Sequence, residues 1–164
     1  MRLTIEHVFE GIAVGDYEAL YFDEAFNEAL GKQLRLGRQL VRFDRSENRI
    51  VRHVCYEPIR DAGHVIDRAY GSSRASFLEE LEYDRTARSG TWRTIPNRFT
   101  DRFRNAGTIE FAAADGGTRR TVHADVKVSA FGFGGLVERL VVAEIERSYA
   151  ATADFTRAWI EAHR

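Results

Sequence analysis

The sequence predicts an α+β protein in which a curved antiparallel sheet of seven strands wraps around one long C-terminal helix. Two observations predict this class. Between residues 34 and 130, segments of alternating apolar and polar residues are separated by turn residues, which is typical of antiparallel strands. From 136 to 160 neither glycine nor proline occurs, and apolar residues recur at helical spacing. The expected order is one strand, two short helices, six strands and the long helix, within a single domain spanning residues 1–164.

Composition excludes several classes of protein. A chain of 164 residues is long enough for one domain with a core of its own. Its 24 basic and 25 acidic residues nearly cancel, so no net charge favours nucleic acid or an anionic membrane. The one cysteine, Cys55, excludes an internal disulfide. With no signal-like or membrane-spanning apolar stretch, we expect a cytoplasmic protein, monomeric or homodimeric, without integral membrane association.

The N-terminal part reads as a strand followed by two helices. Residues 3–9 alternate apolar and polar positions, the period of a half-buried strand. Asp16 follows a glycine and is a plausible helix cap. Apolar residues from 17 to 30 have helical spacing, with a break expected near Asp23.

Three hairpins are expected in the middle of the chain. They pair 34–45 with 49–57, 75–85 with 91–97, and 107–113 with 118–130. Their turns are expected at 46–48, Ser89-Gly90 and 115–117. A connection with a short structured piece at 65–70 joins the first hairpin to the second. In the last strand Val122, Ala124 and Val126 share one face and His123 and Asp125 the other, which indicates a sheet with one solvated face.

Two stretches resemble a known superfamily. One is Gly107-Thr108-Ile109-Glu110-Phe111 followed by Gly117-Thr118-Arg119-Arg120-Thr121-Val122. The other runs from Val126-Lys127-Val128 through Gly134-Gly135-Leu136-Val137-Glu138 into the long helix. They resemble the START-like, polyketide cyclase-like superfamily with its Bet v 1-type helix-grip fold, and most closely an uncharacterised bacterial branch. The architecture covers nearly the whole chain and the motif its last third. The sequence departs from the branch at Ser129-Ala130-Phe131, where a proline is expected before the glycines.

The resemblance implies a hydrophobic cavity between the sheet and the C-terminal helix. Members of the superfamily bind lipids, sterols, polyketides or plant hormones, and a minority catalyse cyclisation or dehydration. It therefore implies binding or transport of a hydrophobic small molecule such as a lipid, isoprenoid or polyketide. The alternative is a polyketide cyclase or dehydrase-type enzyme that uses the same cavity with Glu79 as general base. A third possibility is an interaction module whose cavity is vestigial.

Glu79 is the weak candidate for a catalytic residue. On strand alternation it shares a face with Phe77, Leu81 and Tyr83, an otherwise apolar set. A carboxylate facing a cavity can act as an acid or base, or orient a polar group of a ligand. A bulge at 78–80 would instead return Glu79 to solvent.

Aromatic residues on strands and helix provide the candidate wall of the cavity. The candidate ligand-binding residues are Phe77, Glu79, Leu81, Tyr83, Trp92, Phe111, Tyr149, Thr152 and Phe155. Tyrosine and tryptophan supply polar groups inside an apolar wall, which suits a ligand with a few oxygens. Alternatively, these residues interlock into a solid core. Alternation does not decide whether Trp92 or Arg93 faces inward.

No cofactor or metal site is expected. The five histidines are scattered, without the spacing of a known ligand pair. His7 shares an apolar face with Leu3, Ile5 and Phe9, where a hydrogen-bonded core or rim residue is the ordinary role. His123 and Asp125 share a face and are interpreted as surface residues, although an acid–base relay is the alternative. Gly132 to Gly135 lack the lysine of a phosphate loop.

Overall fold

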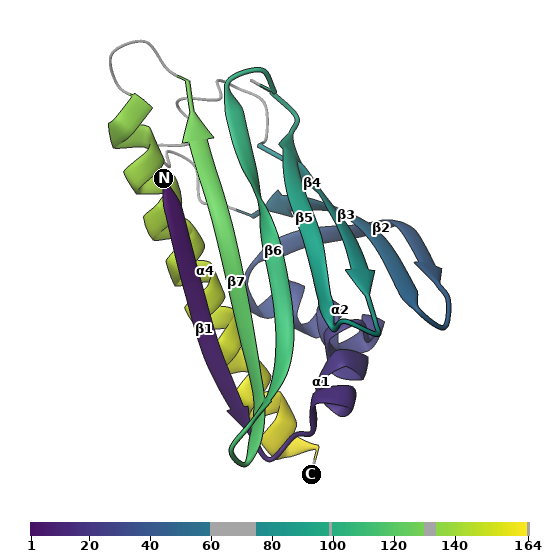
Figure 1. The fold of residues 1–164 in the computed structure, drawn as a ribbon. Helices are drawn as coiled ribbons and strands as arrows, with labels where there is room; N and C mark the ends of the chain where they lie inside the picture. Colours follow the sequence, from purple (N-terminus) through teal and green to yellow (C-terminus); the bar gives the residue numbers. More distant parts are fainter. Residues whose placement is uncertain (60–74, 99, 130–133, 164) are drawn as a thin grey trace.

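The computed structural model describes residues 1–59, 75–98, 100–129 and 134–163, and its main chain is drawn in Figure 1. Strands and helices follow the expected order. The elements are β1 (Arg2–Glu10), α1 (Val14–Tyr21), α2 (Glu24–Gln33), β2 (Leu36–Arg45), β3 (Arg49–Pro58), β4 (Phe77–Asp84), β5 (Ser89–Pro96), β6 (Phe103–Ala114), β7 (Gly117–Val128) and α4 (Gly134–Ala162).

The sheet has seven strands in the order β1-β7-β6-β5-β4-β3-β2, and each neighbouring pair is antiparallel. The sheet curves, and α4 runs along one of its faces beside β1 and β7 (Figure 1). α1 and α2 cover one end of the concave face (Figure 1). The predicted fold class is thereby confirmed.

The two short helices meet at Asp23, as the sequence predicts. Its carboxylate oxygen accepts a hydrogen bond of 2.7 Å from the backbone N–H of Phe26 and caps α2. The prediction that Asp16 caps α1 is wrong. The cap is Ala13, whose backbone is extended, and Asp16 lies within the first turn, where its negative charge still favours the helix N-terminus.

The first hairpin turn lies at 46–48 as predicted, and the third lies at 115–116, because Gly117 already belongs to β7. The expected turn at Ser89-Gly90 is wrong, because these residues already belong to β5 and the turn lies at 85–88. The Asp84 carboxylate accepts hydrogen bonds from the backbone N–H groups of Thr86 and Ala87, at 2.8 and 2.9 Å, and starts the turn early. Arg88 completes it with a positive φ of 52°.

Some expectations fall on residues that the structure does not describe. These are the structured piece at 65–70 and residues 130 and 131 of the stretch Ser129-Ala130-Phe131, where the sequence departs from the bacterial branch. In the described residues no helix is long and apolar enough to cross a membrane.

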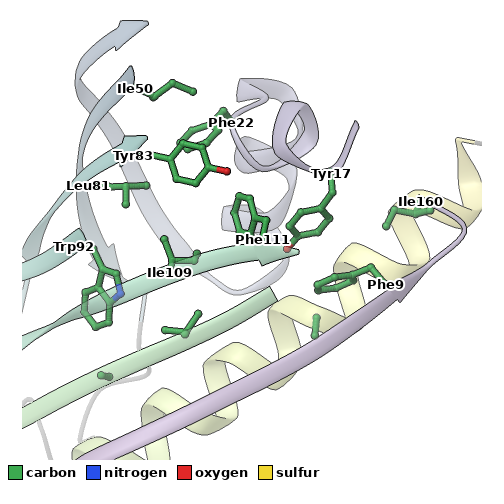
Figure 2. Close-up of a cluster of buried hydrophobic side chains, with 13 residues drawn as sticks. Phe9, Tyr17, Phe22, Ile50, Leu81, Tyr83, Trp92, Ile109, Phe111 and Ile160 are labelled. Carbon is green, nitrogen blue, oxygen red and sulfur yellow. The ribbon is translucent and has the colours of Figure 1, made fainter. Parts of the chain in front are cut away.

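The core lies where the sheet, α1 and α4 meet (Figure 2). Phe9 of β1 stacks on Tyr17 of α1 with 4.7 Å between ring centroids, and Phe111 of β6 meets the edge of Tyr17 at 5.0 Å. Tyr83 of β4 packs against Phe22 at the other side of the cluster, with 5.2 Å between ring centroids. α1 therefore seals this end of the concave face with aromatic side chains.

Candidate ligand-binding site

Glu79 lies in the more exposed part of the concave face, although Val54 and Val126 in its cross-strand row are fully buried. Nearer α1, the side chains of Tyr83 and Ile109 are at most 2% exposed. The next row, with Leu81 and Trp92, reaches 9%. In the row beyond, the Glu79 side chain is 25% exposed. The concave face is thus packed at its α1 end and partly uncovered at Glu79.

Glu79 faces this partly uncovered part. β4 pairs with β3 and β5 in continuous register, so no bulge turns Glu79 outward, and the register shift in the sheet's outer hairpin lies in β2 between Leu40 and Arg42. Its carboxylate oxygen lies 3.2 Å from a terminal nitrogen of Arg52, whose side chain is only 4% exposed. The pair places one negative and one positive charge on the concave face.

Arg52 joins the sheet to α1. Its guanidinium donates to the backbone carbonyl of Tyr21 at 3.3 Å and lies 5.0 Å from the centre of the Tyr21 ring. The Phe22 ring lies 5.4 Å from the same carbon. These aromatic faces stabilise the cation and hold it against the end of α1.

Three tyrosines surround the pair, Tyr21 from α1, Tyr56 from β3 and Tyr149 from α4. Burial raises the pKa of each hydroxyl, and the negative charge of Glu79 raises all three further. Each side chain is nevertheless only half-buried. The Arg52–Glu79 pair therefore has three tyrosine side chains near it that keep part of their surface free.

Two further polar atoms on the concave face are buried without a partner in the described part of the chain. They are the indole nitrogen Nε1 of Trp92 and the amide oxygen Oδ1 of Asn105. The Asn105 amide nitrogen, in contrast, donates to the Thr94 hydroxyl at 3.3 Å. Buried polar atoms in proteins are normally hydrogen-bonded, so this donor and this acceptor are exceptions within the described residues.

Trp92 rather than Arg93 faces inward, which resolves the question that alternation leaves open. Trp92 is 9% exposed, whereas Arg93 is exposed and pairs with Glu80 on the convex face. The indole lies over Gly107 of β6, where a Cβ atom would come 3.0 Å from Cζ2 of the ring.

A small cavity of about 20 Å³ lies between α1, α2, β7 and α4. It is large enough for roughly one water molecule or a group of similar size. Its lining residues are Tyr17, Leu20, Tyr21, Phe26, Asn27, Leu30, Arg120, Thr152 and Thr156.

The structure separates the predicted ligand-binding residues into groups. Phe77, Glu79 and Tyr149 are partly exposed, whereas Trp92, at 9%, belongs to the edge of the core. Leu81, Tyr83 and Phe111 are 0–2% exposed and belong to the packed core. The Tyr83 hydroxyl donates to Glu18 of α1 at 3.2 Å, so it is already engaged within the core.

The two remaining predicted residues, both on α4, lie apart from this set. Thr152 lines the small cavity, and its hydroxyl donates to the Ser148 carbonyl at 2.8 Å. Phe155 packs on Phe26 of α2, with 5.8 Å between centroids, where the two helices meet.

Sequence reasoning missed the buried arginines. Arg52 and Arg120 are 4% and 1% exposed. Strand parity contained the signal, because Arg120 shares the inward face of Val122 and Ala124 in β7. Arg52 has the same parity as the inward Ile50. In both strands, a charged residue at an inward position of the alternation indicates a buried charge.

His7 and His123 have the ordinary roles that were expected. His7 Nδ1 lies 3.3 Å from a terminal nitrogen of Arg120, and burial followed by that positive charge lowers the pKa of His7. His123 is exposed and hydrogen-bonds to the Thr4 hydroxyl at 2.9 Å. Within the described ranges no three histidine, cysteine or acidic side chains gather as metal ligands would.

The sheet, its covering helices and the long C-terminal helix form the helix-grip fold of START-like and polyketide cyclase-like proteins. Solved structures agree. The protein TTHA0849 from Thermus thermophilus superposes with a TM-score of 0.69 at 17% identity, over 99% of both chains. A START superfamily protein from Mycobacterium smegmatis gives 0.58 at 12% identity, over 100% of this chain and 98% of that one.

A polyketide enzyme shares the fold as well. The di-domain ARO/CYC StfQ from the steffimycin biosynthetic pathway gives a TM-score of 0.62 at 12% identity, over 99% of this chain and 52% of its own. The chain belongs to the family described as "Protein of unknown function (DUF2505)", whose model matches residues 17–160. No curated protein matches the sequence.

Proposed function

We propose that this chain, as a single START-like domain, binds a hydrophobic small molecule such as a lipid, isoprenoid or polyketide between the sheet and α4. One observation carries the proposal. Tyr21, Tyr56 and Tyr149 are desolvated but retain free surface around the Arg52–Glu79 pair. A packed core would cover these side chains completely.

The wall of the site combines apolar area with a few polar atoms. Burial of apolar ligand surface contributes about 25 cal/mol per Å² before the entropic costs of binding. Trp92 Nε1 can donate a hydrogen bond and Asn105 Oδ1 can accept one. The proposed ligand is therefore largely apolar and carries at least one oxygen.

Native mass spectrometry on protein purified without detergent, followed by organic extraction, tests the proposal. We expect a stoichiometric extra mass that disappears on denaturation. If the native mass equals that of the protein alone and an apolar dye also fails to bind, the proposal is overturned. An interaction module with a filled core is then favoured.

A matched pair of variants locates the site. Thr94 is half-buried on the concave face of β5, and Thr91 is exposed on the convex face of the same strand. Thr94→Phe fills the interior and should abolish the extra mass, whereas Thr91→Phe adds the same side chain outside and should retain it. Equal uptake by both variants would place the ligand elsewhere.

A cyclase or dehydrase with Glu79 as general base is the second candidate. The inward orientation of Glu79 is the observation that favours it. Glu79→Gln keeps the size of the side chain and removes its basicity, so an enzyme would retain ligand binding and lose turnover. If the variant processes an extracted ligand as fast as the parent protein, Glu79 is an orienting residue only.

A further inference from the structure

Arg120 of β7 is a fully buried cation. It is 1% exposed, and its guanidinium lies between the rings of Phe9 and Tyr149, 5.3 Å from each centroid. A terminal nitrogen donates to His7 Nδ1 at 3.3 Å. The nitrogen Nε has no hydrogen-bond partner among the described residues.

The contacts of Arg120 supply no negative charge. His7 is neutral near pH 7, because burial and the charge of Arg120 hold its pKa below 6.5. Burial raises the pKa of Tyr17 to about 12, so this phenol, which also hydrogen-bonds to Arg120, is neutral as well. In the described parts of the chain no carboxylate forms an ion pair with Arg120.

Two other largely buried arginines each have a carboxylate partner, which Arg120 lacks among the described residues. Arg52 pairs with Glu79, and Arg38, whose side chain is 6% exposed, pairs with Glu24. A guanidinium does not lose its proton in proteins, so burial cannot be relieved by neutralisation. An unpaired buried charge is strongly unfavourable, and the two aromatic faces beside Arg120 compensate less of it than an anion would.

Arg120 also lines the cavity of about 20 Å³, together with Tyr17, Tyr21, Thr152 and Thr156. The space as it stands fits one water-sized group, so a larger group at Arg120 requires the lining side chains to move. A carboxylate matches the planar donor fork of arginine through two parallel hydrogen bonds.

We infer that the ligand is an apolar carboxylic acid whose carboxylate is bound by Arg120. This inference rests on the proposed function, because it names the chemical class of the molecule in that site. The acid group neutralises Arg120, and the apolar body lies against the tyrosines beyond it.

The test compares an acid with its ester. Dodecanoate and methyl dodecanoate compete for the bound neutral dye Nile red in the full-length protein stripped of lipid. We expect dodecanoate to displace the dye at least about tenfold more strongly than the ester, as a charge-assisted bidentate contact implies. Sodium acetate and sodium chloride serve as controls for a small anion without a tail.

Three variants assign the effect. Arg120→Met should bring acid and ester to equal affinity, and Arg120→Lys, which keeps the charge, should keep part of the preference. Arg157→Gln is the control, because Arg157 also lies over the Phe9 ring, at 5.6 Å, but is exposed and paired with Asp154. This variant should retain the full preference.

A thermal measurement separates binding from structure. Arg120→Met removes an unpaired buried charge, so the ligand-free variant should melt at or above the temperature of the parent, and dodecanoate should no longer raise its melting temperature as it does for the parent. A lower melting temperature without ligand would make Arg120 a structural residue and overturn the inference.

The remaining outcomes are distinct. Equal affinity of the parent protein for acid and ester overturns the acid preference and leaves the proposed function standing. Displacement by acetate or chloride as strong as that by dodecanoate means a small anion site and also overturns the inference. If neither Nile red nor either dodecanoyl compound binds, both the proposed function and the inference fail.

Discussion

Arg52 and Glu79 meet diagonally across two neighbouring strands. Arg52 stands opposite Leu81 and Glu79 opposite Val54, and their charged groups approach to 3.2 Å. The pair lies where the packed core gives way to the partly uncovered concave face. It therefore connects the stability of the sheet to the electrostatics of the candidate site.

Replacing Glu79 alone should destabilise the protein. Glu79→Leu leaves the Arg52 cation buried without its carboxylate, and we expect a loss of about 3 kcal/mol in the free energy of unfolding. The double variant Arg52→Met with Glu79→Leu removes both charges and should recover most of that loss. Urea denaturation of the three proteins checks this, and equal losses in the single and double variants would contradict it.

The bond between Tyr83 and Glu18 should stabilise the α1 end of the core. Burial, followed by the negative charge of Glu18, raises the pKa of Tyr83, so the hydroxyl stays protonated and donates to a buried carboxylate. Tyr83→Phe should lower the free energy of unfolding by about 1.5 kcal/mol, the magnitude expected for a hydrogen bond to a charged group. The Glu18 carboxylate also accepts a hydrogen bond from Arg85 Nε at 2.9 Å. The urea midpoint measures the loss, and an unchanged midpoint would show that Arg85 alone satisfies Glu18.

Gly107 should tolerate no side chain. A Cβ atom there would lie 1.8 Å from the backbone oxygen of His123 and 3.0 Å from the Trp92 ring. Gly107→Ala should therefore cost about 2–3 kcal/mol and shift tryptophan emission. In Gly15→Ala the new methyl group meets no atom within 4 Å and lies in α1, so that variant should be neutral or stabilised by up to about 1 kcal/mol.

His7 should make stability depend on pH below 6.5. Burial, then the positive charges of Arg120 and Arg157, lower its pKa from 6.5, against a smaller opposing effect of Asp154. As pH falls below 6.5 the unfolded chain binds the proton more readily than the folded protein, so the free energy of unfolding decreases. Above 6.5 this contribution is complete. His7→Gln should flatten the dependence between pH 5 and about 7 in urea titrations, and an unaltered slope would contradict the assignment.

Periodicity predicted the elements well because each long strand or helix repeats its signal several times. The break at Asp23 and the long C-terminal helix were predicted for this reason. The turn before Ser89 was misplaced because a single side chain, Asp84, decides where it begins. A turn position that depends on one side chain leaves no periodic signal in the sequence.

The candidate site was only partly predictable. Alternation placed Glu79 on the inward face, but it could not show that Arg52 reaches it diagonally from another strand. Nor could it show that Tyr83 is bonded to Glu18, because that contact joins a helix to a strand 65 residues later. Side-chain partners across elements depend on three-dimensional packing that a single sequence does not encode locally.

The pairing of β1 with β7 has a consequence for synthesis on the ribosome. β1 is synthesised before the other strands, but its pairing partner β7 is the last strand to be made. Phe9, for example, can pair with Thr118 only after that residue has been translated. The hairpins between them can form as they emerge, since their contacts are local, whereas the N-terminal strand can join only after nearly the whole sheet has been translated. The nascent chain therefore exposes the unpaired edge of β1 for most of its elongation, and the last strand and α4 complete the fold together.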